Sequence, residues 1–343
     1  MEMKTTVPVA PDEARASEPL IVVPCLNEAA HIGTLLAQLR RTIARVGGRI
    51  VVVDGGSTDG TFDIAAKHAN LCPRVHLMRN PQRIQSIGIN MAVERFGDMA
   101  THLIRIDSHC GYPEDFCDLL LQDARSVYAD CIVVGMVAQG NNRIQRINAT
   151  VQNSFIGNGG SRHRVHPLAG YVDHGHHALI KLAAFRAVGG YDPSFTHNED
   201  AELDYRLRRA GYRIWLTSKT VVTYYPRDTL HALARQYFNH GKGRASNLIK
   251  HRIIPGLRQA KVVLVLPAVL VAGLSGFSVA FAVPALIWVS ACLGAGVAMV
   301  IRTRQPDLVI SGISAMLMHF SWSLGFWQRV ISRLPTLLVE RAS

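Results

Sequence analysis

Short apolar runs alternate with amphipathic stretches along the first third of the chain. The runs at residues 20–24, 49–54, 74–80 and 102–109 have the length and apolar character of buried strands. The stretch between the first two, residues 27–46, repeats its apolar residues at helical spacing instead. Those positions are Ile32, Leu35, Leu36, Leu39 and Ile43. Strands that alternate with helices in this way predict a parallel sheet with helices on both faces.

Polar residues follow each of these predicted strands, in the segments PCLNE, DGGSTD, NPQR and IDSH. Ligands of parallel α/β sheets bind where the carboxyl ends of the strands meet. The candidate ligand contacts are Asn27, Glu28, Asp54, Asp59, Arg83, Asp107 and His109. Any one of them could instead form a turn or cap a helix. Four polar strand ends in succession favour a cleft for a nucleotide.

The C-terminal part of the chain is far more apolar. Residues 262–301 contain no charged residue, and a membrane span takes about 20 apolar residues. This run therefore fits two short spans with a turn near residues 273–276, and a buried helical hairpin in a soluble core is the alternative. A further uncharged run, residues 308–328, is flanked by arginines on both sides. It either spans the membrane or lies in its interface.

These patterns divide the chain into five predicted segments. They are a tail at 1–17, an α/β domain at 18–226, a basic membrane-proximal segment at 227–261, transmembrane or interfacial helices at 262–334, and a tail at 335–343. The N-terminus carries early acids and no apolar signal sequence, so the part before the apolar run is expected to stay in the cytosol.

Charge and cysteine content narrow the function classes. The net charge is +12, and eight basic residues against one acid lie between Arg227 and Lys261. Basic residues beside a membrane segment favour the cytoplasmic side and attract anionic headgroups. A nucleic-acid-binding stripe is the alternative, but the sequence has no recognisable nucleic-acid module; we therefore expect membrane lipid, and no nucleic acid, as a partner. The six cysteines form no CxxC pair, which indicates reduced thiols rather than disulfides or a zinc ribbon.

Five motifs together resemble those of family 2 glycosyltransferases, which have a GT-A fold. They are PCLNEAAHI, VVVDGGSTDGT, IRIDSH, NEDAELDYRLRRAGYRIWL and QYFNHGKGR, in this order between residues 18 and 250. The stretches GYVDHGHHALI and FRAVGGYDPSFTHNED are similar, more narrowly, to the glucosyltransferases of succinoglycan exopolysaccharide synthesis in rhizobia.

The resemblance implies a Rossmann-like, mostly parallel α/β domain of the GT-A type, followed by transmembrane helices, at the bacterial inner membrane with the catalytic domain in the cytosol. It implies an inverting transfer of glucose from UDP-glucose, in a β-1,3 linkage, to a galactosyl diphosphate-polyprenol, with other polysaccharide-synthesis proteins as further partners. The alternative is a non-catalytic nucleotide-sugar-binding subunit, which the intact Glu199–Asp200 pair and Asp107 disfavour. A nucleotidyltransferase would carry a basic, Gly-rich signature near the N-terminus, which this chain lacks.

Inverting transfer requires charge compensation for the departing diphosphate and a base for the acceptor hydroxyl. Asp107 and His109 lie two apart, so on an extended chain both side chains face the same way. The family pattern here is Asp-x-Asp, and this chain has Asp-Ser-His. We expect Asp107 and His109 to hold Mg²⁺ or Mn²⁺, the imidazole nitrogen being tolerated better by Mn²⁺. His109 could instead hydrogen-bond the diphosphate or cap a turn.

The resemblance assigns the base to Asp200. Glu199 is the alternative base or a group that orients the acceptor, and a simple helix cap is the other interpretation of Asp200. The residues that the resemblance places around the donor are Pro24, Asn27, Glu28, Asp54, Ser57, Arg83 and Asp107. Among them Asp54 would accept a hydrogen bond from the uracil imide, and Gly55 stands where the family commonly has a second acid. Arg83 would meet a phosphate or remain in solvent.

Acceptor binding is assigned to two places in the chain. Gln236 and Arg244 match part of the family's Gln-x-x-Arg-Trp region, without its Trp, which favours addition of a single sugar. A planar guanidinium suits a diphosphate. His174, His176 and His177 are expected to contact the acceptor sugar or phosphate, with a zinc site or a plain loop as alternatives.

Overall fold

The first four strands pair in parallel, as their alternation with helices predicts. They are β1 (Pro19–Cys25), β2 (Arg49–Asp54), β3 (Val75–Arg79) and β4 (His102–Arg105), in the order β3-β2-β1-β4. The computed structural model describes residues 18–161, 164 and 168–342, with side chains to residue 334.

Helices cover both faces of this sheet. They are α1 (Ala29–Val46), α2 (Thr61–Leu71), α3 (Gln85–Phe96), α4 (Phe116–Ser126), α7 (Leu182–Ala187) and α8 (Glu199–Arg209). Because alternate strand residues point to opposite faces, Ile21 and Val23 of β1 pack with α1, α2 and α4. Leu20 and Val22 pack with α3, α7 and α8. Burial on both faces explains why these strands are continuous apolar runs in the sequence.

The second half of the sheet is mixed. It contains β5 (Cys110–Gly111), β6 (Cys131–Ala138), β7 (Gly170–Tyr171), β8 (His176–Lys181) and β9 (Ile214–Tyr224). The order continues β4-β8-β6-β9-β5, with β7 also paired to β9. β8 is antiparallel to both β4 and β6, while β6 and β9 are parallel. The parallel arrangement is therefore confirmed for β1 to β4, and the whole sheet has the GT-A-like mixed α/β arrangement.

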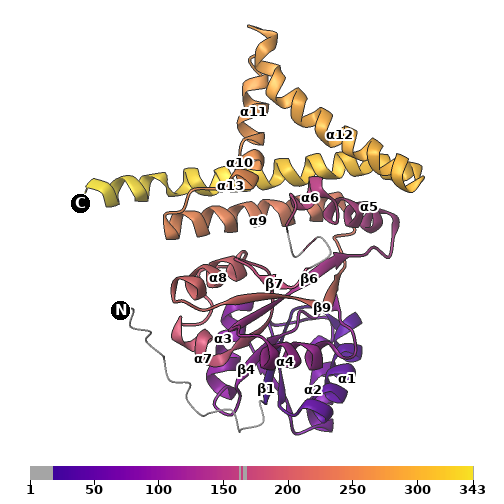
Figure 1. The fold of residues 1–343 in the computed structure, drawn as a ribbon, viewed down its shortest axis with the longest axis vertical. Coiled ribbons are helices and arrows are strands. Elements are labelled where there is room, and N and C mark those ends of the chain that lie inside the picture. The colour runs from indigo at the N-terminus through magenta and orange to yellow at the C-terminus, as the bar shows by residue number, and fades with distance from the viewer. Residues whose placement is uncertain (1–17, 162–163, 165–167, 343) are drawn as a thin grey trace, which may run out of the picture.

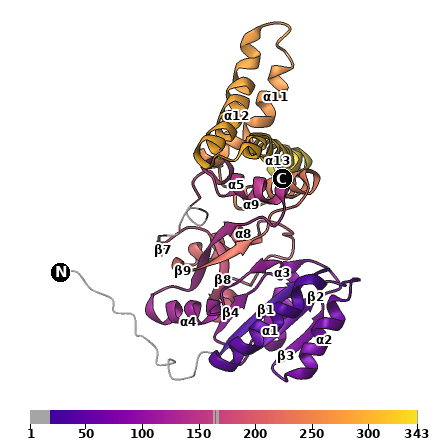
Figure 2. The same cartoon turned by 90° about the vertical axis from the view of Figure 1, so that its right-hand side faces the viewer.

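The C-terminal helices form a separate layer beside the sheet domain. They are α9 (Leu230–His251), α10 (Leu257–Val263), α11 (Val265–Ala272), η2 (Val279–Ala282), α12 (Val283–Thr303), η3 (Pro306–Ile310) and α13 (Ser311–Ala342), with α5 (Arg143–Gln152) and α6 (Phe155–Asn158) against them. Figures 1 and 2 show α9 and α13 side by side, between the sheet domain and a hairpin made by α11 and α12.

Glycines allow α9 and α13 to touch backbone to backbone. A Cβ on Gly241 would lie 2.0 Å from the carbonyl oxygen of Trp322, and one on Gly325 would lie 2.0 Å from that of Phe238. Any side chain at either position would therefore separate the two helices. The close approach holds α13 along the basic helix α9.

Two segments in the described part of the chain are long and apolar enough to cross a membrane. They are Val279–Thr303 and Pro306–Leu334, with mean hydropathies of 2.0 and 1.4. Only 11% of the apolar window of the first is buried, against 50% for the second, which packs on α9. The predicted turn near residues 273–276 coincides with the tip of the α11–α12 hairpin.

Candidate active site

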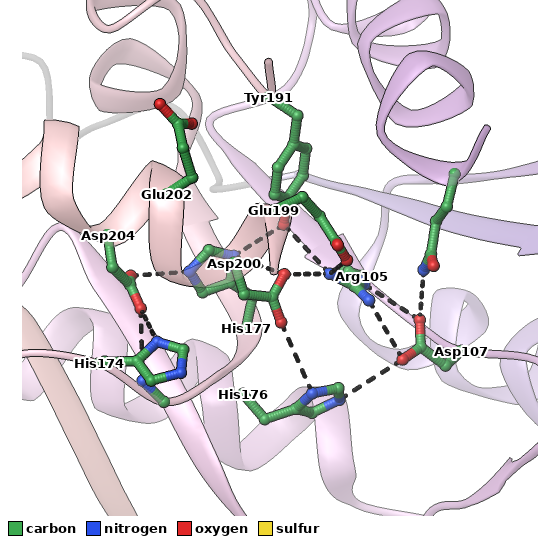
Figure 3. Close-up of polar contacts among 12 residues, drawn as sticks. Arg105, Asp107, His174, His176, His177, Tyr191, Glu199, Asp200, Glu202 and Asp204 are labelled. Atoms are coloured by element: carbon green, nitrogen blue, oxygen red, sulfur yellow. Dashed lines mark hydrogen bonds and ion pairs between the residues drawn. The ribbon is translucent and has the colours of Figure 1, made fainter. Parts of the chain in front are cut away.

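The site is built around a buried arginine. Asp107 follows the end of β4, and its Oδ1 accepts hydrogen bonds from Arg105 Nε at 3.0 Å and Gln85 Nε2 at 2.8 Å. Arg105 Nη1 donates to Asp200 Oδ1 and lies 3.4 Å from Glu199 Oε1 at the start of α8. The Arg105 side chain is only 6% exposed. One cation thus joins the predicted metal-binding acid to both predicted base residues (Figure 3).

The pKa values of the three acids around Arg105 shift in different directions. Burial opposes ionisation of Asp107 and Asp200, but the charge of Arg105 outweighs it and lowers the pKa of both carboxyls. Burial and the neighbouring Asp200 raise the pKa of Glu199 to about 7. Near neutral pH, a proton shared by the pair therefore resides on Glu199, and Asp200 is the ionised carboxylate. A general base must be in that state.

Two neighbouring histidines of β8 hold Asp200 from different sides. His176 lies between the acids, with Nε2 3.7 Å from Asp107 Oδ2 and Nδ1 3.8 Å from Asp200 Oδ2. Burial lowers the pKa of His176 to about 4, so its ring is neutral. His177 Nδ1 lies 3.4 Å from Asp200 Oδ1. Successive strand residues point to opposite faces, which places the two rings differently around the same carboxylate.

His177 belongs to a buried polar chain behind Asp200. Its Nδ1 is 2.7 Å from the Tyr191 hydroxyl, and its Nε2 is 2.7 Å from Asp204 Oδ1. The other oxygen of Asp204 is 2.7 Å from His174 Nδ1. The His177 side chain is 0% exposed, so the structure places it behind the Asp200 carboxylate rather than in a cavity. Of the predicted acceptor histidines, His174 lines a cavity. His176 lies close to Asp107, which lines another.

A cleft at the carboxyl ends of β1, β2 and β4 brings most predicted donor residues together. Its empty space, part of which is open solvent, is about 540 Å³. Pro24, Glu28, Arg83, Asp107 and His109 all line it. This is the edge of the sheet at which the sequence predicts a nucleotide.

The other predicted donor residues shape the loops of this cleft. Asp54 is 1% exposed, and its carboxylate accepts from the N–H groups of Gly56 and Ser57 at 2.9 Å and 3.2 Å. Ser57 Oγ accepts from the N–H of Asn27 at 2.9 Å, and Asn27 Oδ1 accepts from the N–H of Thr58 at the same distance. These contacts fasten the two loops to each other. Asp59 likewise accepts from the N–H of Ala29 and acts as a turn residue.

A second and larger cavity of about 890 Å³ lies between the start of α8 and the membrane-proximal helices. It is lined by residues of α6, α8, α9, α10 and α13, among them Arg244, Arg258 and Trp322. His174 and Asn198, which lie shortly before β8 and α8, line it as well. In the described part of the chain, no carboxylate lies within ion-pair distance of Arg244, and its Nε has no hydrogen-bond partner. Burial and the nearby Arg258 lower the pKa of Arg244. A half-buried cation without a counter-ion is suited to bind an anion.

Gln236 lies elsewhere on α9. Its Nε2 donates to the Tyr224 hydroxyl at 2.7 Å, which joins α9 to the end of β9, and it does not line the larger cavity. The predicted acceptor residues therefore separate in the structure. Arg244 and His174 share one cavity, and Gln236 belongs to the packing between the sheet and α9.

Comparison with known proteins identifies the family of the chain. The sequence model described as glycosyl transferase family 2 matches residues 20–189. The succinoglycan biosynthesis protein ExoA of Rhizobium meliloti (strain 1021) is 49% identical over 320 residues, which cover 93% of this chain and 97% of that protein. The chain belongs to glycosyl transferase family 2.

One solved structure shares the fold over most of its length. The mannosyltransferase PcManGT from Pyrobaculum calidifontis, in complex with GDP-Man and Mn²⁺, has a TM-score of 0.56 at 19% identity. The similarity covers 92% of this chain and 90% of that chain. S. aureus TarS 1-349 in complex with UDP-GlcNAc has a TM-score of 0.47 at 14% identity, over 91% of this chain and 92% of that one.

The cleft of this glycosyltransferase offers suitable donors for a divalent cation. The carboxylates of Asp107 and Glu28 line it, and hard oxygen ligands of this kind bind Mg²⁺ or Mn²⁺ together with substrate phosphates. His109 is half-exposed, and its Nδ1 lies 3.4 Å from Glu28 Oε1. That hydrogen bond is the main reason why the pKa of His109 is raised. The residues therefore fit a cation held between a carboxylate and the donor diphosphate.

A different trio also brings metal-ligand atoms together. In the described residues, Cys131, His177 and Asp204 place one ligand atom each within 4.8 Å of the others. All three are buried, and both ring nitrogens of His177 already contact Tyr191 and Asp204. Burial raises the pKa of the Cys131 thiol, which keeps it in the form that binds metals poorly. The arrangement is that of a polar core contact.

Sequence reasoning missed Arg105, Gln85, Tyr191 and Asp204. A signal for Arg105 was present, because it lies two residues before Asp107 on an extended segment and so faces the same side. The contacts of Tyr191 and Asp204 depend on β8 lying beside α8. No spacing in the sequence indicates that arrangement.

Proposed function

We propose that this glycosyltransferase moves a hexose from a UDP-sugar onto a sugar carried by a polyprenyl diphosphate, during synthesis of an exopolysaccharide repeat unit. The sugar is glucose from UDP-glucose, and the linkage formed is β-1,3, as in succinoglycan synthesis. The extensive identity to ExoA supports the pathway. The catalytic domain faces the cytosol at the inner membrane, with the basic helix α9 against the lipid headgroups.

One observation carries the proposal. Arg105 contacts both Asp200 and Asp107, and Asp107 lines the donor cleft, while Asn198 and Ala201, on either side of the Glu199–Asp200 pair, line the larger cavity. The larger cavity also reaches helices α10 and α13 of the membrane-proximal layer and contains two arginines. A lipid-linked diphosphate has the chemistry to fill it.

The reaction then follows from these positions. The acceptor hydroxyl gives its proton to Asp200 and attacks the anomeric carbon of the donor sugar from the side opposite the leaving group. The bond from the anomeric carbon to the diphosphate oxygen breaks, and UDP leaves with the bonding electron pair, so the configuration inverts. Asp107 would hold a divalent cation, which would supply positive charge to offset the charge that develops on the diphosphate. Arg105 keeps Asp200 ionised before the transfer and orients it toward the acceptor.

Product identification tests the proposal directly. Purified protein is incubated with a panel of UDP-sugars, a galactosyl diphosphate-polyprenol and Mg²⁺ or Mn²⁺, and the lipid product is analysed for sugar and linkage. A β-1,3-linked glucose on the lipid acceptor is expected. Another sugar or linkage would correct the finer proposal, and an acceptor without lipid would overturn the role of the larger cavity.

Asp200→Asn distinguishes the enzyme from a binding subunit. Loss of a general base is expected to lower kcat by about 10²- to 10⁴-fold, while the affinity for the UDP-sugar, measured by calorimetry, stays close to that of the unsubstituted protein. Unchanged turnover in this variant would remove Asp200 from its role as the base.

A further inference from the structure

Beyond α10, the α11–α12 hairpin contributes no residue to either of the two cavities described above. Its first limb runs from α10 through α11, residues 257–272, and its second limb is α12. Figure 1 shows both limbs leaving the α9–α13 layer on the side away from the sheet and meeting at a common tip. The tip is formed by residues 273–278 and the short helix η2.

The first limb is too short to cross a bilayer. A helix rises about 1.5 Å per residue, so the 16 residues from 257 to 272 reach about 24 Å along the helix axis. Its uncharged part begins only at residue 262 and reaches about 16 Å. The hydrocarbon core is about 30 Å thick. α12 is longer, but it shares the tip with the first limb and is inclined to it (Figure 1), so it adds no depth.

The tip has the side chains of a segment that stays in hydrocarbon. No charged residue occurs between residues 262 and 301. Phe277 is 88% exposed and Val279 is 75% exposed. A turn in water beyond the membrane would expose these side chains to solvent at a cost that scales with their apolar area.

Backbone hydrogen bonds at the tip are satisfied within the tip itself. The N–H groups of Gly273, Leu274, Ser275 and Phe277 donate to carbonyls three residues earlier, at 2.9–3.1 Å. The Ser278 hydroxyl accepts from the N–H of Ala280 at 3.3 Å. A lipid environment offers no water to partner free N–H groups, and this turn leaves few of them.

Charged residues stand where the hairpin meets the α9–α13 layer. Arg258 and Lys261 lie in α10, at the start of the first limb, and Arg302 and Arg304 lie at the end of the second. All four therefore lie at the same end of the hairpin, where anionic headgroups would complement them. α13 does not continue the hairpin as a third span, since it packs along α9 through Gly241 and Gly325.

We propose that the α11–α12 hairpin is a re-entrant membrane wedge. It enters the bilayer from the catalytic side, turns within the hydrocarbon core and returns to the same side, so that its tip does not reach the far surface. The inference rests on the proposed membrane location and is independent of the sugar, the linkage and the acceptor.

Cysteine accessibility tests the wedge in the full-length protein. Ser275→Cys and Ser278→Cys place thiols at the tip, and Thr303→Cys places one at the catalytic-side end of α12, where the side chain is exposed. Intact spheroplasts are treated with a membrane-impermeant maleimide, and labelling is compared with that of the unsubstituted protein. The native cysteines lie in the sheet domain or, for Cys292, buried in α12.

The wedge predicts no labelling of either tip cysteine in spheroplasts and full labelling of both after detergent solubilisation. Thr303→Cys should be labelled once the cells are lysed without detergent. Labelling of the tip cysteines in intact spheroplasts would overturn the wedge in favour of two spans. Recovery of the unsubstituted protein in the soluble fraction would instead overturn the membrane location in the proposed function.

A charge at the tip gives a second readout. Ser275→Lys combined with Phe277→Lys puts two charges where the wedge places hydrocarbon, and the membrane-bound fraction is expected to fall roughly tenfold or more. A turn exposed to water would accept both lysines, so an unchanged membrane fraction would count against the wedge. Arg302→Lys combined with Arg304→Lys is the control. Both substitutions keep a positive charge at the other end of the hairpin, so the membrane-bound fraction should not change.

Discussion

Arg105 places one positive charge among three carboxylates, those of Asp107, Glu199 and Asp200. Its guanidinium contacts Asp107, just after β4, and Glu199 and Asp200 of α8, which lie 92 and 93 residues farther along the chain. The planar fork of arginine can contact both groups at once, which a single ammonium cannot do. The relative positions of the donor-side acid and the base therefore depend on this side chain.

Arg105→Gln is expected to destabilise the fold by about 3–5 kcal/mol, because the buried carboxylates of Asp107 and Asp200 lose their counter-ion. Transfer should fall with it, since the pKa of Asp200 rises when the cation is removed. Arg105→Lys is the matched variant. It should recover much of the thermal stability but little of kcat, and thermal unfolding together with steady-state kinetics measures both. A lysine variant with full turnover would contradict the need for a bidentate contact.

We predict that sugar transfer depends on a divalent cation bound by Asp107 and His109. Chelation with EDTA is expected to abolish transfer, and Mn²⁺ or Mg²⁺ to restore it, because the departing diphosphate then regains its charge compensation. His109→Asp replaces a nitrogen with a hard oxygen and should shift the preference toward Mg²⁺. If the His109→Ala variant keeps the metal preference of the unsubstituted protein, His109 contacts the diphosphate rather than the cation. Full activity without any divalent cation would contradict the metal site.

Motifs predicted the acids of the site far better than their partners. Asp107, Glu199 and Asp200 were identified because each lies in a short segment that resembles a family pattern. Arg105 lies in one of the same segments. A basic residue beside an acid at a strand end is common in sequences, so it does not by itself indicate a functional residue. His177 was expected to contact the acceptor, and its burial behind Asp200 depends on the packing of β8 against α8.

At the scale of elements, the sequence predicts the pairing of strands that follow one another in the chain, but not the pairing of strands that are far apart in it. The strands β1 to β4 follow one another through single helices, and alternation alone predicts their parallel order. β8 lies between β4 and β6 and runs antiparallel to both. That placement brings His176 and His177 to Asp200, yet it pairs segments more than 40 residues apart in sequence, for which no periodicity exists.

The contact between α9 and α13 depends on two glycines. Gly241→Ala puts a methyl group 2.0 Å from the carbonyl oxygen of Trp322, and the overpacking is expected to destabilise the protein by about 1–3 kcal/mol. Gly294→Ala on α12 is the matched control, because nothing lies within 4 Å of its added Cβ. Thermal unfolding in detergent should separate the two variants. Equal melting temperatures would show that the two helices can move apart without cost.

At the scale of the whole molecule, the larger cavity joins the catalytic domain to the membrane-proximal layer. Its walls come from α8, which carries Asp200, and from α9, α10 and α13. An acceptor anchored in the membrane could therefore place its sugar at Asp200 while its lipid remained among the C-terminal helices. Sequence periodicity predicted both the sheet domain and the apolar helices, but the cavity between them exists only because α9 and α13 lie across the domain.

Arg244→Gln tests this arrangement. Loss of the half-buried guanidinium is expected to raise the KM for the lipid-linked acceptor roughly ten- to hundredfold, the range of a lost charged hydrogen bond. The KM for the UDP-sugar should not change, because Arg244 lies outside the donor cleft. Arg235→Gln removes the same charge from an exposed position on the same helix and should leave both constants unchanged. An equal rise in both variants would mean that the charge of α9 as a whole, rather than the cavity, attracts the acceptor.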